Sequence, residues 1–335
     1  MSTPRPWPRG AATGIGSLPG TDPLETLRTV LGDLPELPYL PELPARGPGA
    51  DLLGRAAALL VDLPVELVPS GWRIAGRPGR DLRRARDLLA RDLDAVSTLA
   101  ADHDGAFKVA VAGPWTLAAG IELPNGHRVV TDHGATRDLA ASLAEGLRTL
   151  FAELAARMPR AGLVGQLDEP SLPAVLAGTL PTASGWGTVR HVDRATVRDT
   201  LGEVLGALPA AAPRVVHCCA DTPPVALFRE AGATGLALDL ATLDTASTDA
   251  VGTAVDDGVA LLLGVVPGRA AAVPDFAVVR DRLTGWWSRL GFPVDRLADV
   301  VVPTPACGLA GATPAYARAV AAVLRDVGRA SAELS

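Results

Sequence analysis

Three residues with metal-binding side chains stand at the ends of two apolar runs that are far apart in the chain. His217-Cys218-Cys219 ends one run, and Thr304-Pro305-Ala306-Cys307-Gly308 ends the other. The whole protein has only three cysteines and five histidines, so these positions hold much of its capacity to bind a soft metal. Imidazole nitrogen and thiolate sulfur are the ligands that zinc prefers. Because a thiolate-rich zinc ion can bind and activate a substrate thiol, the pattern points to methyl or alkyl transfer.

The spacing around His217 divides the neighbouring cysteines between two faces. On an extended strand successive side chains alternate, so His217 and Cys219 share one face and Cys218 points to the other. The first pair can therefore bind one metal ion, with Cys307 arriving from the second run. Cys218 is expected to pack among helices as a small hydrophobic side chain. The alternative for His217, Cys219 and Cys307 is a set of buried structural residues.

Composition restricts the class of protein. Of the 335 residues 48% are hydrophobic, enough for a large core, and the net charge is -6. Lys108 is the single lysine, and no basic cluster is interleaved with aromatic residues, so nucleic acid is not an expected partner. Residues 1–20 lack an apolar signal-peptide core, and the longest apolar run, Val259–Val266, is too short to span a membrane. We expect a cytoplasmic protein with reduced thiols and no membrane partner.

Short apolar runs alternate with Ala/Leu/Arg-rich stretches of helical spacing, which is typical of parallel strands joined by helices. This predicts a (β/α)8 TIM barrel, a single domain over residues 1–335 with residues 1–10 flexible; a doubly wound open sheet is the alternative. The proline-rich segment Leu34–Pro48 is predicted to be an extended active-site loop. Strands are predicted at Thr13–Ser17, Val65–Pro69, Phe107–Ala112, Leu163–Asp168, Arg214–Cys218, Gly235–Leu240, Val259–Val265 and Val300–Pro303. Helices are predicted at Asp81–Ala101, Asp138–Met158, Arg194–Leu208, Pro224–Ala231, Phe276–Leu290 and Pro314–Arg329.

Polar residues follow several of these predicted strands. In a barrel the carboxyl ends of the strands meet at one mouth, where the chemistry takes place. The residues at these ends are Ser17, Asp168 with Glu169, His217 with Cys219, Asp239, and Cys307.

A family resemblance rests on five short motifs that occur in the family's order and spacing. They are Ile15-Gly16-Ser17-Leu18-Pro19, Gly113-Pro114-Trp115-Thr116, Leu167-Asp168-Glu169-Pro170, His217-x-Cys219 and Thr304-Pro305-Ala306-Cys307-Gly308-Leu309. Together they resemble the C-terminal catalytic domain of cobalamin-independent methionine synthase, one of the uroporphyrinogen-decarboxylase-like barrels. The resemblance covers essentially the whole chain. It implies a methyltransferase of methionine biosynthesis that uses zinc to activate homocysteine as a thiolate and methylates it.

The resemblance also implies roles for individual residues in the zinc site. His217, Cys219 and Cys307 would be ligands, and a carboxylate would be the fourth. The family has a glutamate at the end of the next strand, where this chain has Asp239, which could instead cap the following helix. Two cysteines and a carboxylate would leave the incoming homocysteine sulfur electron-rich, since three negative charges reduce the Lewis acidity of zinc.

For the substrate, Asp168 matches the family residue that receives the amino group of homocysteine, and Ile15, Gly16 and Ser17 match the contacts to its carboxylate. Glu169 is assigned to the same pocket. A structural hydrogen bond is the alternative role for Asp168. The remaining motif offers less: Gly113 and Pro114 shape a turn, and Trp115 is assigned to the pocket wall.

The chain departs from the family in ways that leave the methyl donor open. It begins directly at the catalytic barrel, and it has no histidine near Gly264–Pro267, where the family carries an acid for the folate leaving group. The segment from Pro41 to Asp51 does not align securely. The donor is methyltetrahydrofolate or a methylcorrinoid, possibly carried by a corrinoid protein, and these departures favour the corrinoid. A porphyrinogen decarboxylase-like lyase and a non-catalytic zinc- or thiol-binding barrel are the alternative functions.

Overall fold

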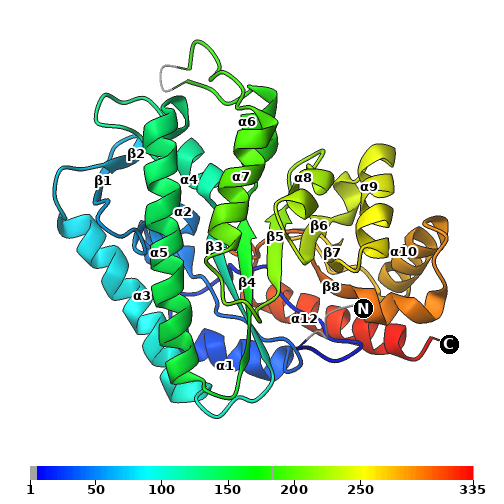
Figure 1. Ribbon diagram of the computed structural model, residues 1–335. Helices are drawn as coiled ribbons and strands as arrows, with labels where there is room; N and C mark the ends of the chain where they lie inside the picture. Colours follow the sequence, from blue (N-terminus) through cyan, green and yellow to red (C-terminus); the bar gives the residue numbers. More distant parts are fainter. Residues whose placement is uncertain (1–5, 183–184, 335) are drawn as a thin grey trace.

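The computed structural model describes residues 6–182 and 185–334, and a six-stranded parallel sheet lies at its centre (Figure 1). Neighbouring strands follow one another in the sequence, and the sheet curls like part of a barrel. Every residue of β3, β7 and β8 is buried, as expected for a parallel sheet that is covered on both faces. Six of the predicted strands are thereby confirmed. They are β3 (Ala106–Ala112), β4 (Gly162–Asp168), β5 (Arg214–Cys218), β6 (Gly235–Asp239), β7 (Ala260–Val266) and β8 (Val301–Pro305).

The first predicted strand, Thr13–Ser17, is an extended segment without a regular ladder. Thr13 donates its backbone N–H to the carbonyl of Pro303 in β8 at 3.3 Å. Farther along, Ser17 forms an isolated parallel bridge with Glu42. This segment therefore lies between the outer edge of β8 and a second extended segment around residue 42.

The second predicted strand, Val65–Pro69, is confirmed as a strand, but it is not part of the main sheet, so its predicted place in the barrel is wrong. Val65–Val68 (β1) pairs with Gly71–Ile74 (β2) in an antiparallel hairpin. Beside β3 lies instead Tyr39, which bridges to Lys108 from the proline-rich segment that was predicted to be an active-site loop. Prolines lack the N–H that a ladder needs, so this segment can supply only isolated bridges.

Helices cover the outer face of the curled sheet (Figure 1). The six predicted helices are confirmed, with ends that differ by a few residues. The α-helices are α1 (Pro23–Asp33), α2 (Leu52–Ala57), α3 (Arg80–Leu99), α4 (Pro114–Gly120), α5 (His133–Arg157), α6 (Leu172–Ala177), α7 (Arg194–Leu205), α8 (Val225–Glu230), α9 (Thr245–Asp256), α10 (Phe276–Arg289), α11 (Leu297–Val300) and α12 (Pro314–Ala332). Short 3-10 turns are η1 (Pro44–Arg46), η2 (Val129–Thr131), η3 (Leu240–Thr242) and η4 (Val294–Arg296).

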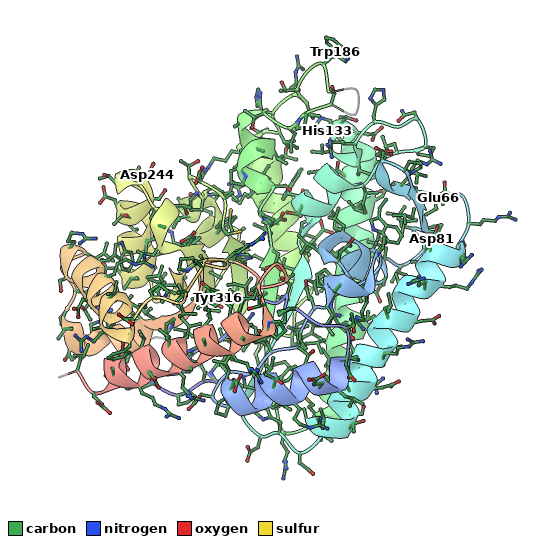
Figure 2. The ribbon with its side chains drawn as sticks, turned by 180° about the vertical axis from the view of Figure 1, so that it is seen from behind. Glu66, Asp81, His133, Trp186, Asp244 and Tyr316 are labelled. Carbon is green, nitrogen blue, oxygen red and sulfur yellow. The ribbon has the colours of Figure 1, made fainter. Side chains whose placement is uncertain are left out.

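Several helices begin at an aspartate whose side chain accepts hydrogen bonds from the first turn. Asp132, Asp193 and Asp244 do so for α5, α7 and α9. Asp244, labelled at the outer end of α9 in Figure 2, accepts from the backbone N–H of Ser247 at 2.7 Å. Such caps satisfy N–H groups that have no partner within the helix.

The apolar core has two layers because side chains alternate along each strand. Val215 belongs to the cluster inside the curl, and the next residue, Val216, belongs to the cluster between sheet and helices. Trp7 is buried in the inner cluster, so the predicted flexible end is packed at that residue, while residues 1–5 lie outside the described part of the chain. No helix in the described ranges is long and apolar enough to cross a membrane.

Candidate metal centre and substrate pocket

His217, Cys219 and Cys307 meet at the carboxyl ends of the strands. His217 lies in β5, Cys219 follows that strand directly, and Cys307 follows β8. One ligand atom from each of these residues lies within 4.8 Å of the others, and the two sulfur atoms are 2.9 Å apart. Cys218 is fully buried in the helix-side core. The alternation expected from the sequence therefore separates Cys218 from the cluster.

One nitrogen of the His217 imidazole is held by a carboxylate, and the ring also interacts with the Cys307 sulfur, which contributes to the pKa of both groups. Its Nδ1 lies 3.0 Å from Oδ1 of Asp168, at the end of β4. Its Nε2 is buried and has no hydrogen-bond partner among the residues that the structure describes. A histidine that ligates a metal through one nitrogen usually donates its other N–H to a carboxylate or carbonyl. The arrangement of the ring fits that of a metal-binding histidine.

The charges of the cluster favour thiolate character at one cysteine. The hydrogen bond from the Cys219 thiol and the nearby His217 lower the pKa of Cys307 to about 4, although burial opposes this. The pKa of Cys219 is raised, because its thiol proton is held in the hydrogen bond to Cys307 and burial disfavours a second thiolate. Burial opposes the charge on His217, but Asp168 and the Cys307 thiolate raise its pKa to about 9. Two sulfurs, one of them acidified, and an unengaged imidazole nitrogen are a donor set that fits zinc.

Asp239 lies at the end of β6 and is not part of the group of converging ligand atoms. Its Oδ1 accepts the backbone N–H of Ala241 at 2.9 Å and so caps η3. Burial raises its pKa, and the negative charge of Cys307 acts in the same direction. The carboxylate is thus engaged as a cap while close enough to Cys307 for their charges to interact.

The segment Ile15-Gly16-Ser17 runs beside the loop that carries Cys307. The backbone carbonyl of Ser17 accepts the N–H of Leu309 at 2.7 Å. A Cβ built on Gly308 would lie 2.1 Å from Ser17 Oγ, so the glycine allows this close approach. Of the residues predicted to bind substrate, Ile15, Gly16, Ser17 and Asp168 therefore share one region with the metal cluster.

Glu169 occupies a different place from the predicted one. It is fully buried, and its carboxylate accepts the backbone N–H of Trp115 at 3.0 Å and both the N–H and hydroxyl of Thr116 at 2.7 and 2.8 Å. It therefore holds the first turn of α4. Gly113 makes this possible, since a Cβ there would lie 2.4 Å from Glu169 Oε1. Despite these hydrogen bonds, burial raises the pKa of Glu169 to about 7.

Trp115 is likewise part of the helix layer, so its assignment to the pocket wall is wrong. The side chain is 1% exposed, and its indole N–H donates to the carbonyl of Val197 in α7 at 3.1 Å. The sequence motif suggests a pocket residue because the tryptophan follows a tight turn, but its indole hydrogen bond connects α4 to α7.

Sequence reasoning missed three buried polar residues beside the cluster. Glu42 lies next to Gly16, whose added Cβ would be 3.6 Å from the Glu42 carboxyl carbon. Burial raises the pKa of Glu42 to about 7, while Arg55 opposes the rise. Lys108 and Gln166 lie beneath the pocket on β3 and β4. The sequence does contain a signal for Lys108 and Gln166. Each is a single charged or amide residue within an otherwise apolar run, as in Phe107-Lys108-Val109, and such a residue indicates a buried polar contact.

Comparison with known proteins identifies the family and the fold. Residues 10–330 match the family model described as "Cobalamin-independent synthase, Catalytic domain". No curated protein matches the chain. A B12-independent methionine synthase from Shewanella sp. W3-18-1, solved with selenomethionine, is similar with a TM-score of 0.62 and 13% identity, covering 97% of this chain and 98% of that one. A putative vitamin-B12-independent methionine synthase from Listeria monocytogenes has a TM-score of 0.57 and 15% identity, with 96% of each chain covered.

Proposed function

Because the chain belongs to the family of cobalamin-independent synthase catalytic domains, we propose that it is a zinc-dependent methyltransferase that converts homocysteine to methionine. The observation that carries the proposal is the convergence of His217, Cys219 and Cys307 beside the buried carboxylates of Asp168 and Glu42. Homocysteine offers a thiol for the metal and an ammonium group for the carboxylates.

His217, Cys219 and Cys307 would hold the zinc ion, with His217 using its unengaged Nε2. Asp239 is our proposal for a fourth ligand, because the charge of its carboxylate interacts with that of Cys307. Its cap on η3 uses Oδ1, so the ligand atom would be the other oxygen. When bound, zinc would supply the positive charge that lets the homocysteine thiol ionise near neutral pH.

The protein's own residues would bind and orient the amino acid. Asp168 and Glu42 accept its ammonium group, and the segment from Ile15 to Ser17 faces its carboxylate. Held in this way, the homocysteine sulfur attacks the methyl carbon; the sulfur–carbon bond forms as the donor's bond to that carbon breaks. Fixing the two reacting atoms in line lowers the entropic part of the barrier.

The donor we propose is methyltetrahydrofolate. The departures of the sequence from the family pattern favoured a methylcorrinoid, but membership of a cobalamin-independent family does not support that preference. With the folate donor, the ring nitrogen that loses the methyl group takes up a proton.

We also propose that residues 10–330 act as one catalytic unit. The extended segments around Thr13–Ser17 and Tyr39–Glu42 would then take the places of the first two strands of an eight-stranded barrel, joining β8 to β3.

The test is to measure zinc content and then methionine formation from homocysteine with each donor separately, beside Cys307→Ala as the inactive control. We expect about one zinc per chain and methionine from methyltetrahydrofolate. Formation only from methylcobalamin would overturn the donor assignment. If the zinc-loaded protein binds homocysteine but methylates it from neither donor, the proposed enzyme activity is wrong and the protein is a non-catalytic thiol-binding barrel.

A further inference from the structure

Lys108 is a fully buried cation in β3 that contacts two residues close to the metal cluster, Ile15 and Gln166. It is the single lysine in the chain and is 0% exposed. Its Nζ donates to the backbone carbonyl of Ile15 at 2.6 Å and to Oε1 of Gln166 at 2.8 Å, and it lies 5.3 Å from the centre of the Tyr39 ring. Because burying a charge is costly unless it is paired and hydrogen-bonded, these contacts must hold the ammonium group in one position.

The contact with Lys108 decides which way the Gln166 amide faces. Since Oε1 accepts from the ammonium group, Nε2 must point the other way, and it donates to Oδ1 of Asp168 at 2.7 Å and to the Ile15 carbonyl at 3.1 Å. The same Oδ1 lies 3.0 Å from Nδ1 of His217. An unbroken series of hydrogen bonds therefore runs from Lys108 through Gln166 and Asp168 to the proposed metal ligand.

The Ile15 carbonyl joins the same network from the other side of the pocket. It accepts from both Lys108 and Gln166, and the backbone that follows it forms Gly16 and Ser17. Burial lowers the pKa of Lys108 to about 8, and the charges of the nearby carboxylates of Asp168 and Glu42 oppose this shift. Lys108 thus contacts Ile15 and interacts through its charge with Asp168 and Glu42, three of the groups to which the amino-acid end of homocysteine is assigned.

We propose that Lys108 is a positioning residue that holds the Ile15 backbone, the Gln166 amide and, through that amide, the Asp168–His217 pair in the arrangement needed for zinc and homocysteine. An inverted amide would place Oε1 against the Asp168 carboxylate, and the two oxygens would repel each other. Lys108 excludes that orientation. The part of this inference that concerns zinc rests on the proposed metal site alone, and the part that concerns homocysteine rests on the proposed reaction as well.

The first test replaces the cation with a neutral side chain of similar length, Lys108→Met. The matched control is Arg46→Met, which removes a buried cation that pairs with Asp92 in the helix layer. Zinc affinity is measured by competition with a chromophoric chelator, and homocysteine affinity by calorimetry on zinc-loaded protein. We expect Lys108→Met to weaken zinc binding about tenfold, the lower end of the range for direct partners of metal ligands, because Gln166 and Asp168 stand between Lys108 and His217. Homocysteine binding should weaken at least tenfold. Arg46→Met should change only the unfolding temperature.

Wild-type affinities for zinc and homocysteine in a folded Lys108→Met protein would overturn the proposal. If wild-type protein binds no homocysteine, the proposed function fails, and the zinc measurement still decides the role of Lys108. If Lys108→Met does not fold, Gln166→Leu replaces it, because this change keeps the cation and removes the connection to Asp168. Normal zinc affinity in Gln166→Leu would then count against the inference.

A spectroscopic measurement adds a signal that a merely structural lysine would not give. Protein labelled with carbon-13 lysine has one set of side-chain signals, because Lys108 is the single lysine. Homocysteine should shift the Lys108 Cε signal, since Ile15 and Asp168 belong to the network around it. An unmoved signal at saturating homocysteine, once calorimetry has established binding, would contradict the positioning role.

Discussion

Nδ1 of His217 lies 3.0 Å from Oδ1 of Asp168, and this contact leaves the buried Nε2 of the same ring without a hydrogen-bond partner among the described residues. Asp168 therefore has two tasks in the proposed enzyme. It orients a zinc ligand, and it supplies a negative charge for the ammonium group of homocysteine. The two tasks can be separated by substitution.

Asp168→Asn keeps an oxygen that can accept from His217 and Gln166 but removes the charge. We expect zinc affinity to stay within a few-fold and homocysteine affinity to fall by about 1.5–3 kcal/mol, the value of a charge-assisted hydrogen bond. Asp168→Ala removes the acceptor as well and should weaken zinc about ten- to hundredfold. Chelator competition and calorimetry measure the two affinities. Equal zinc loss in both variants would show that charge, not orientation, is what His217 requires.

The three cysteines should differ in their effect on zinc. We expect Cys219→Ala and Cys307→Ala to lose about one zinc per chain and Cys218→Ala to keep it, because Cys218 is buried on the helix side of β5. Elemental analysis of the purified variants measures this, with circular dichroism as the check on folding. Loss of zinc in folded Cys218→Ala would contradict the assignment of faces.

Glu42 should make homocysteine binding depend on pH. Burial raises the pKa of Glu42 to about 7, so its carboxylate is mostly neutral below that pH and charged above it. If it pairs with the substrate ammonium group, homocysteine affinity should rise as pH increases through 7. Glu42→Gln should be about tenfold or more weaker at pH 8 and should lose this rise. Calorimetry from pH 6 to 8 on both proteins measures it, and the same rise in Glu42→Gln would exclude Glu42 as its source.

Gly113→Ala should destabilise the fold through Glu169. The added Cβ would lie 2.4 Å from Oε1 of that carboxylate and displace it from the N–H groups of Trp115 and Thr116. A buried carboxylate that loses partners costs about 1–3 kcal/mol or more. Urea unfolding measures the loss. Gly76→Ala is the control, because nothing lies within 4 Å of a Cβ at Gly76, and it should change stability by no more than about 0.5 kcal/mol.

The sequence predicted the regular part of the fold well and the irregular part poorly, for a physical reason. Mainly apolar runs such as Val259–Val265 fit a strand that is buried on both faces, and six such runs formed β3 to β8. The segment around Tyr39 contacts β3 by an isolated bridge. Its prolines interrupt the alternation of apolar and polar residues from which a strand is predicted. Val65–Pro69 has strand-forming residues and does form a strand, but it pairs in a hairpin with Gly71–Ile74 and not with β3. The strand pattern of a segment does not say which partner it takes.

The same distinction applies to the site. Strand alternation alone placed His217 and Cys219 together and Cys218 apart. Glu169 was misassigned because Asp168 and Glu169 are adjacent in the sequence, yet adjacent side chains leave a strand end in different directions. Lys108 could not be recognised as part of the pocket, since its neighbours Ile15 and Gln166 come from distant parts of the chain.

Lys108 should also make the free energy of unfolding depend on pH in the alkaline range. Burial lowers the pKa of Lys108 to about 8, against the opposing charges of Asp168 and Glu42, whereas in the unfolded chain it is about 10.4. Between these values the unfolded chain carries a proton that the folded chain lacks, so the free energy of unfolding gains a contribution that rises with pH. Below about pH 8 both states are protonated and the contribution is constant. Tyr39 and the cysteine thiols titrate in both proteins. Their contributions therefore cancel when the free energy of unfolding of Lys108→Met is subtracted from that of the wild type. The difference, from urea unfolding at several pH values, should be flat up to about pH 7.5 and then rise towards pH 10; a flat difference throughout would contradict the burial of a charged lysine beneath the pocket.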